Sequence, residues 1–227
     1  MISGFLILFL LANGPAAGMT AELDRARDRQ DRAALEKLAA KAADGASADD
    51  AAAQYRIAVA QSYVAEVAQE LRDKDGARNA AEAGIKAAQR AVELKPNVAE
   101  HHRILGTLCG QVIPANVLAG MKYGRCALDE ISKALELDPK SAKAYVSRGV
   151  GNYYLPPAFG GGVEPAIRDF RKAIELDGRS AEGWLWLGLG LRKANQNAEA
   201  RKAFQKAIQL NPNRVWAKEQ LDKTPAQ

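Results

Sequence analysis

The chain has 227 residues, of which 48% are hydrophobic and 26% charged, so it can bury a core and is not an intrinsically disordered chain. Aromatic residues make up only 6%, whereas alanine is abundant and favours helices that pack closely together. The net charge of +5 comes from 32 basic and 27 acidic residues that are intermixed, with no basic stripe of the kind that binds nucleic acid.

The N-terminal segment has the composition of a targeting sequence. Residues 1–21 carry no charged side chain, and residues 5–12 form an unbroken apolar run that small residues follow. This run is shorter than the ~20 residues of a membrane-spanning helix. We therefore predict a signal peptide over residues 1–21 and an exported protein, periplasmic or secreted. Because no Lys or Arg precedes the run, a short uncleaved leader is the alternative.

The segment after this leader predicts one helix. Residues 21–43 place Leu23, Leu35 and Leu38 on one side, and Gly45 ends the pattern. We expect an N-terminal capping helix within residues 22–46, because an array of helical hairpins needs a lid over its first apolar edge.

The clearest repeated unit spans residues 180–212. Its apolar residues recur at helical intervals on two predicted helices, and the turn between them falls at 195–197. Gly188 would let the second helix approach the first. The pattern consists of Trp184, Leu187, Gly188, Leu191, Ala200, Phe204, Ala207 and Pro212.

The ending of this unit appears four times along the chain. "KAIQLNPN" at 206–213 is repeated as "KAIELDGR" at 172–179, "KALELDPK" at 133–140 and "RAVELKPN" at 90–97. The two middle copies are longer than the last, and we expect their extra residues in loops at 110–123 and 155–162, inside the hairpins. The first copy is looser, with helices over 54–71 and 77–94. Residues 213–227 should form a C-terminal capping helix and tail.

These spacings resemble the tetratricopeptide family over residues 47–212. The resemblance implies an all-α, right-handed α-solenoid of about four hairpins with capping helices at both ends. Two stretches, "LAGMKYGRCALDEISKALELDPKSA" at 118–142 and "YYLPPAFGGGVEPAIRDFRKAIELD" at 153–177, are also similar to two narrower groups. These are exported tetratricopeptide proteins related to the TRAP-transporter-associated T component, and the microtubule-dynamics regulator proteins.

The sequence offers little that could perform catalysis. Its two histidines, His101 and His102, are adjacent, so on a helix they diverge by about 100° and cannot chelate one ion together. No Cys-x-x-Cys or H-E-x-x-H spacing occurs. We therefore predict a protein that is not an enzyme and has no cofactor or metal.

The two cysteines leave two interpretations open. Cys109 lies near the end of one predicted helix and Cys126 lies in the next, so a disulfide forms only if the loop between them folds back. Two buried thiols that act as small apolar residues are the alternative.

In this family the first helix of each hairpin lines the concave surface, so the resemblance implies a binding groove there. The candidates form an apolar centre with a basic rim, unlike the polar carboxylate clamp of chaperone-binding members. Burial of these side chains under a capping helix or an inserted loop is the alternative. The candidates are Arg103, Thr107, Lys143, Val146, Val150, Tyr153, Tyr154, Leu185, Leu189 and Arg192.

The function that follows is a non-catalytic interaction scaffold that binds a peptide segment or partner protein in this apolar groove. The alternative is a periplasmic component that binds an apolar small molecule in association with a transporter. Neither reading involves nucleic acid, or a stable membrane span once the signal is removed.

Overall fold

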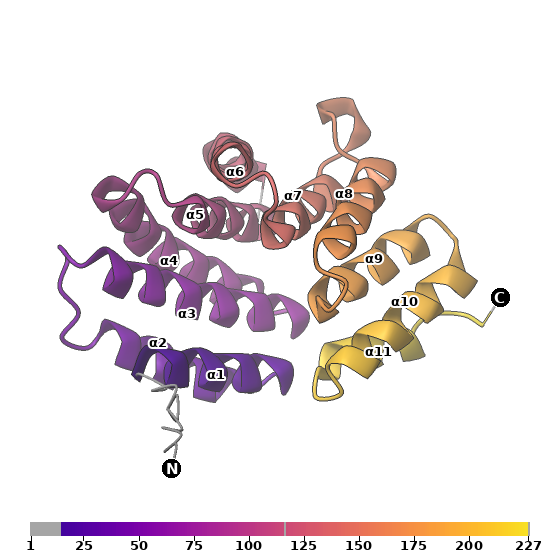
Figure 1. Cartoon of the computed structure of the whole chain (residues 1–227), viewed down its shortest axis with the longest axis horizontal. Coiled ribbons are helices and arrows are strands. Elements are labelled where there is room, and N and C mark those ends of the chain that lie inside the picture. Colours follow the sequence, from indigo (N-terminus) through magenta and orange to yellow (C-terminus); the bar gives the residue numbers. More distant parts are fainter. Residues whose placement is uncertain (1–14, 116, 227) are drawn as a thin grey trace, which may run out of the picture.

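The computed structural model describes residues 15–115 and 117–226, and every regular element in this part of the chain is a helix (Figure 1). The α-helices are α1 Pro15–Asp28, α2 Arg32–Ala43, α3 Ala51–Glu70, α4 Lys74–Leu94, α5 Ala99–Val112, α6 Val117–Leu137, α7 Ala142–Tyr154, α8 Val163–Leu176, α9 Ala181–Lys193, α10 Asn197–Leu210 and α11 Val215–Asp222. Two short 3₁₀ turns, η1 Ile113–Ala115 and η2 Pro157–Phe159, lie inside two of the hairpins.

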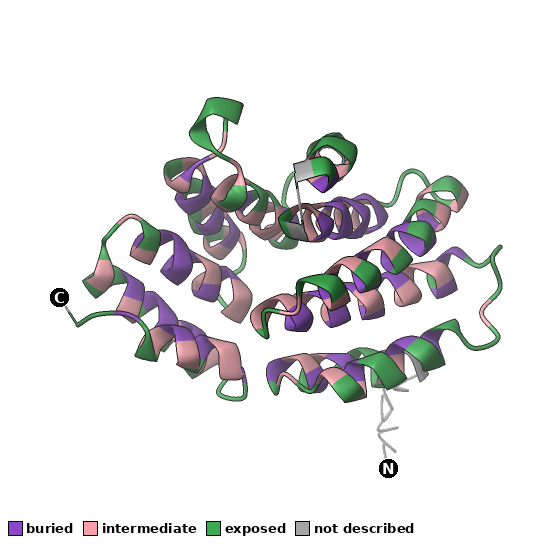
Figure 2. Ribbon diagram, turned by 180° about the vertical axis from the view of Figure 1, so that it is seen from behind, coloured by how far each residue is buried: buried purple, intermediate pink, exposed green. Residues whose placement is uncertain are grey.

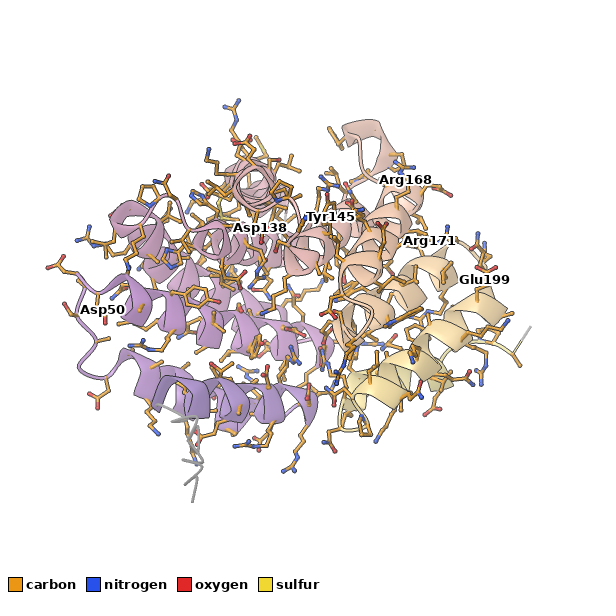
Figure 3. All side chains as sticks on the ribbon, in the orientation of Figure 1. Asp50, Asp138, Tyr145, Arg168, Arg171 and Glu199 are labelled. Atoms are coloured by element: carbon orange, nitrogen blue, oxygen red, sulfur yellow. A yellow bond between two sulfur atoms is a disulfide. The ribbon has the colours of Figure 1, made fainter. Side chains whose placement is uncertain are left out.

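The helices pack as consecutive antiparallel hairpins in two rows. In each hairpin the first helix contacts the second, and successive first helices also contact one another, from α1 to α3, α5, α7 and α9 (Figure 1). We call these first helices the inner row and their partners the outer row. Charged side chains such as Arg168, Arg171 and Glu199 project from outer-row helices (Figure 3). The predicted all-α solenoid is confirmed.

The single capping helix predicted for residues 21–43 is wrong, because the chain forms two helices there. Gln30 adopts a left-handed conformation with φ 53°, and Asp31 then caps α2 through its side chain. The amide of Asp31 donates to the carbonyl of Ala26 across this turn. The same bond closes the α3–α4 turn at Arg72 and the α9–α10 turn at Asn195. The α1–α2 pair is therefore a further hairpin of the array.

The extra residues of the α5–α6 hairpin are mostly helical, in contrast to the loop expected at 110–123. Helix α5 continues to Val112, and α6 begins at Val117 and has 21 residues. The added turns of α6 bury Ala119 but leave Leu118 and Met121 exposed. Residues 118–122 are good helix formers apart from Gly120, so the insertion lengthens the helix instead of interrupting it.

The second insertion, at 155–162, forms the expected loop. Its η2 turn points outward from the end of α8 (Figure 1), and the amide of Gly162 donates to the carbonyl of Asn152 to close the loop. A Cβ atom on Gly161 would lie 2.3 Å from the carbonyl oxygen of Leu155, so this close approach of two backbones requires glycine.

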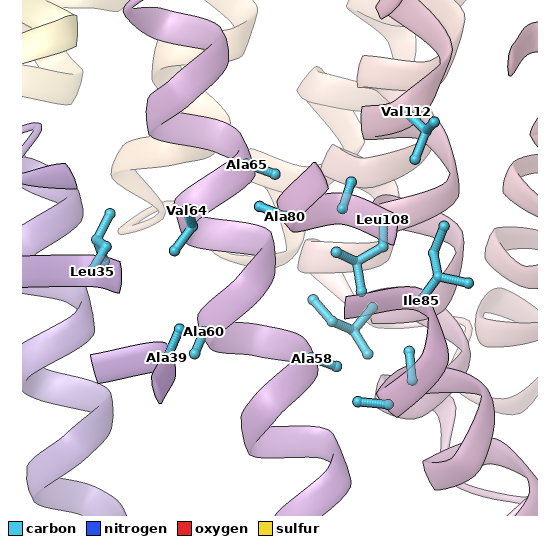
Figure 4. Packing of buried hydrophobic residues seen from close by; sticks show 14 of the residues in the cluster. Leu35, Ala39, Ala58, Ala60, Val64, Ala65, Ala80, Ile85, Leu108 and Val112 are labelled. Atoms are coloured by element: carbon cyan, nitrogen blue, oxygen red, sulfur yellow. The ribbon is translucent and has the colours of Figure 1, made fainter. Parts of the chain in front are cut away.

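The buried apolar side chains form two separate clusters. The N-terminal core joins α1 to α6 and is rich in alanine, with Leu35, Val64 and Leu108 among its larger members (Figure 4). The C-terminal core joins α7 to α11 around Phe170 and Phe204. Buried residues follow the facing sides of the helices within each part (Figure 2). Trp216 and Leu221 of α11 pack on the C-terminal core, as predicted for a capping helix.

Gly188 provides the close contact between helices expected in the last repeat. A Cβ atom there would lie 2.6 Å from Cε1 of Phe204, so Gly188→Leu should wedge α9 from α10 and lower the free energy of unfolding by about 1–3 kcal/mol. Gly151 is the control, because a Cβ there meets nothing within 4 Å, and Gly151→Ala should instead stabilise the helix by up to about 1 kcal/mol. Chemical denaturation of both variants measures the difference; equal stabilities would refute the assigned contact.

Candidate functional site

The structure divides the predicted groove residues into an open set and a buried set. Leu185 and Leu189 belong to the C-terminal core, at 1% and 4% exposure, so they do not line an open groove. Arg192 is held by α11 and the tail, where its guanidinium donates to Gln220 and to the hydroxyl of Thr224. The predicted continuous apolar groove is thus interrupted, because Leu185 and Leu189 are buried in the C-terminal core and Arg192 is held by α11 and the tail.

Arg103 is also engaged within the inner row. Its guanidinium binds both carboxylate oxygens of Glu100, at 2.7 and 2.6 Å, and lies 3.4 Å from the hydroxyl of Ser147 on α7. Thr107 and Ser147 share a hydrogen bond of 3.0 Å. Tyr55 of α3 donates to Glu100. These contacts tie α3, α5 and α7 together, so Arg103 is not a free cation that could attract acidic groups.

The open part of the predicted site lies on α7. Lys143 is exposed, Val146 and Val150 are half-buried, and Tyr154 is the most open aromatic residue of the set, at 58% exposure. The ring of Tyr154 makes edge contacts with Tyr153 at 5.0 Å and with Trp186 of α9 at 6.3 Å. Four of the ten predicted residues therefore share one open surface with a fixed aromatic ring.

The hydroxyl of Tyr154 has a raised pKa. Burial by the surrounding protein, together with Tyr153 and Glu70, raises this pKa to about 12. The Tyr154 ring itself lies at the open edge of an aromatic group that also contains Tyr153 and Trp186.

A cluster of ion pairs, which the sequence analysis missed, closes the inner row at this end. Arg214 precedes α11 and is 2% exposed. Its guanidinium binds Glu66 at 2.8 Å and Glu70 at 3.1 Å on α3, and Glu182 at 2.9 Å on α9. Arg27 pairs with Asp28 and Glu182 beside it. We call these residues the junction cluster: Arg27, Asp28, Glu66, Glu70, Glu182 and Arg214.

The junction cluster holds more negative than positive charge. Its four carboxylates face two guanidinium groups, and Oε2 of Glu182 is buried without a hydrogen-bond donor among the described residues. Burial lowers the pKa of Arg214, but the neighbouring carboxylates outweigh this effect and raise it. Burial also raises the pKa of Glu66 to about 8, although Arg214 opposes this shift. Burial and the excess negative charge of the cluster thus favour the protonated form of Glu66.

The raised pKa of Glu66 predicts that stability depends on pH. The folded state keeps a proton that the unfolded state loses near pH 4.5, so the free energy of unfolding falls as pH rises from about 4.5 to about 8. The limiting slope for this one group is about 1.4 kcal/mol per pH unit. Glu66→Gln mimics the protonated form and should flatten this part of the profile. Denaturation at several pH values tests both proteins, and parallel profiles would contradict the assignment.

The sequence gives only a weak indication of the junction cluster. Glu66 and Glu70 are spaced four residues apart in an otherwise apolar stretch of α3, which places two carboxylates on one buried helix face. Their partners lie more than 100 residues away, since Arg214 is 144 and 148 residues from them. Only the tertiary fold brings the two sets together.

The adjacent histidines serve the packing of the hairpins. His101 stacks on Tyr55 and bonds the carbonyl of Ala91. His102 contacts Glu130 at 2.6 Å and the carbonyl of Pro96 at 2.7 Å. Within residues 15–115 and 117–226, no group of three or more His, Cys, Asp or Glu is arranged to hold a metal ion. Over the same ranges, no helix is both long and apolar enough to cross a bilayer.

The two cysteines form a disulfide that joins α5 to α6. The Cα atoms of Cys109 and Cys126 are 6.0 Å apart, because α6 folds back along α5. Of the two interpretations left open by the sequence, the structure therefore shows the disulfide and not two free thiols. It attaches the inserted turns of α6 to the N-terminal core.

Curated relatives match less than half of this chain. It is 32% identical over 101 residues to anaphase-promoting complex subunit 3 of Schizosaccharomyces pombe, covering 44% of this chain and 14% of that protein. It is 34% identical over 99 residues to tetratricopeptide repeat protein 36 of Xenopus tropicalis, covering 42% of this chain and 46% of that protein. The chain thus spans less than half the length of either relative.

Solved structures share the fold. A tetratricopeptide protein from Thermus thermophilus is 17% identical with a TM-score of 0.58, covering 90% of this chain and 97% of that one. PilF of Pseudomonas aeruginosa is 19% identical with a TM-score of 0.50, covering 73% and 66%.

Two family descriptions match the sequence directly. The tetratricopeptide repeat matches residues 181–214, which is the unit with the clearest spacing. The description "Regulator of microtubule dynamics protein 1-3" matches residues 19–155, more than half of the chain. The resemblance to the transporter-associated T component stays a prediction. The chain belongs to the family of regulator of microtubule dynamics proteins 1-3 and is built from tetratricopeptide repeats.

Proposed function

We propose that the chain is a non-catalytic scaffold that binds an extended segment of a partner protein on its inner face, with Tyr154 as the anchor. The observation that carries this proposal is the open ring of Tyr154 on the inner row, which edge contacts with Tyr153 and Trp186 hold in place. Aromatic side chains in such positions dominate the energy of protein interfaces. Tetratricopeptide repeats are typically non-catalytic, and the family's description names the regulation of microtubule dynamics, which supports a protein partner.

The charge of this surface favours a segment with basic residues. Arg103 is paired with the carboxylate of Glu100, and Arg192 keeps its charge but is held by the neutral acceptors of Gln220 and Thr224. Glu66 and Glu70 belong to a cluster with excess negative charge. A Lys or Arg of the partner can stack on the ring of Tyr154. The apolar side chains Val146 and Val150 would contact its neighbouring residues. We therefore favour a basic segment over the acidic one that a basic rim would attract.

Selection of phage-displayed random peptides on the purified protein tests this function. Enriched peptides should carry Arg or Lys beside an apolar residue, and Tyr154→Ala should weaken their binding by roughly 30-fold, which corresponds to about 2 kcal/mol for an anchor residue. Fluorescence anisotropy measures the dissociation constants of the wild type and the variant.

Phe159→Ala is the matched control. Phe159 is an aromatic residue of similar size that is 75% exposed on the outward η2 turn, so its loss should leave binding unchanged. Binding that depends on Phe159 but not on Tyr154 would place the interaction on the outer loop. A bound apolar molecule of constant mass in native mass spectrometry, released by denaturation, would favour the transporter-associated alternative instead.

We also propose that the chain is exported. The apolar run at residues 5–12 and the disulfide between Cys109 and Cys126 support this, since disulfides persist in oxidising compartments. Residues 1–14 lie outside the described part of the structure. Because α1 begins at Pro15 and Met19 packs on the N-terminal core, removal of the whole predicted signal at 1–21 would shorten α1. N-terminal sequencing of the mature protein shows whether cleavage occurs and where.

A further inference from the structure

The two halves of the molecule do not share one apolar core. The N-terminal core spans α1 to α6 and the C-terminal core spans α7 to α11. Along the chain the halves meet where α6 and α5 contact α7, and the hydroxyls of Thr107 and Ser147 bond across this contact. At the far end of the inner row, the ends of α1 and α3 meet α9 and the start of α11 through polar groups.

Arg214 is the main link at that end. It contributes hydrogen bonds to α3 through Glu66 and Glu70, and to α9 through Glu182. A fourth bond reaches the backbone carbonyl of Arg27 on α1. Asn211 adds a bond of 2.7 Å to Asp28. Residues from the first two hairpins and from the last are thus held by one guanidinium group, across the superhelix.

We propose that Arg214 acts as a clasp that holds the first and last hairpins together across the inner face, and that a basic side chain of the partner displaces it. The second part rests on the proposed function. Arg214 occupies the carboxylates of Glu66 and Glu70, so its guanidinium already fills the position that a basic side chain of the partner would take. Opening the clasp exposes Glu66 and Glu70 to the inner face.

The charge and chemistry of the site make this exchange feasible. Leaving buried carboxylates without a cation costs a large amount of free energy. Exchanging the guanidinium of Arg214 for one from a partner keeps the carboxylates paired, so the exchange changes the free energy much less. The planar guanidinium fork makes the bidentate contacts that a Lys ammonium cannot make. Separate apolar cores allow the two halves to move apart at α6–α7 without exposing a shared core.

The distance between the first hairpin and the last hairpin shows directly whether the clasp is closed. Spin labels on Lys37→Cys in α2 and Lys202→Cys in α10 report it, and both sites are exposed. The native cysteines are bridged, so no other thiol competes for the label. In the wild type the distance distribution should be narrow. In Arg214→Ala it should broaden and shift to longer distances.

Two controls separate the clasp from a general loss of stability. Arg148→Ala removes another arginine with a bidentate carboxylate partner, Asp169 of α8, which lies in the same half of the molecule, so the end-to-end distance should stay narrow. Ethylguanidinium added to Arg214→Ala should restore the short distance, whereas ethylammonium should not. If Arg214→Ala does not fold, Glu70→Gln keeps the arginine but weakens its hold, and it should give a broadened distribution.

Competition is tested with an oligo-arginine peptide as the probe. It should bind Arg214→Ala about tenfold more tightly than the wild type, because the binding-competent form is then populated without displacement. It should also widen the distance in the wild type. An unchanged distance in Arg214→Ala overturns the proposal, as does equal affinity of both proteins for the probe. The same two results in a protein that also carries Tyr154→Ala, a wider distance and tighter binding of the probe, would support the clasp. They would contradict only the proposal that Tyr154 is the anchor.

Discussion

Replacing Arg214 with alanine is expected to lower the free energy of unfolding by about 3–5 kcal/mol. The guanidinium is 2% exposed and is the partner of three carboxylates on α3 and α9. Its removal leaves buried carboxylates without a compensating positive charge, and no new interaction offsets this cost. Part of this loss should be recovered at low pH, where the remaining carboxyl groups take up protons.

Denaturant unfolding measures this loss, with Arg125→Ala as the control. Arg125 lies on α6 with a side chain that is 92% exposed and a weak contact of 3.8 Å to Asp129, so its removal should change stability by less than about 0.5 kcal/mol. A double-mutant cycle between Arg214 and Glu70 should give a coupling energy of at least about 1 kcal/mol. Similar losses in the two arginine variants would show that the junction cluster contributes little.

The hairpins could be predicted because their signals are local. The four repeated endings mark the ends of α4, α6, α8 and α10, and each depends on residues within a single turn. The α1–α2 hairpin was missed because its turn uses Gln30 in a left-handed conformation where Gly or Asn would have been recognisable. Similarly, Gly110, Pro114 and Gly120 in the insertion favour a loop over 110–123, whereas only the short stretch at Pro114 separates α5 from α6.

The site could be predicted only in part, for a related reason. Helical spacing identified Val146, Val150 and Tyr154 as inner-row residues, and the structure leaves them on an accessible surface. The same spacing could not show that Leu185 and Leu189 would be buried in the C-terminal core. Whether a side chain on the inner row is open depends on how far the superhelix curves and where its end returns. Those are properties of the whole array.

Reduction of the disulfide between Cys109 and Cys126 is expected to lower the free energy of unfolding by about 3 kcal/mol. The bond closes a loop with a sequence separation of 17, and a cross-link of this size removes about that much conformational entropy from the unfolded chain. Cys109 is fully buried and Cys126 is partly buried, so reduction should require partial opening of the α5–α6 hairpin. Unfolding in denaturant with and without dithiothreitol gives the difference.

The loss should be accompanied by local loosening at the start of α6. These turns bury Ala119 but expose Leu118 and Met121, so apolar packing alone holds them weakly and the disulfide supplies much of their attachment. Hydrogen exchange at residues 117–123 should therefore accelerate on reduction, while α9 and α10, which belong to the other core, keep their protection. A variant with both cysteines replaced by alanine should not respond to dithiothreitol. If reduction changes neither stability nor exchange in the wild type, the inserted turns are held by packing against α5, and the bridge is not what fixes this part of the array.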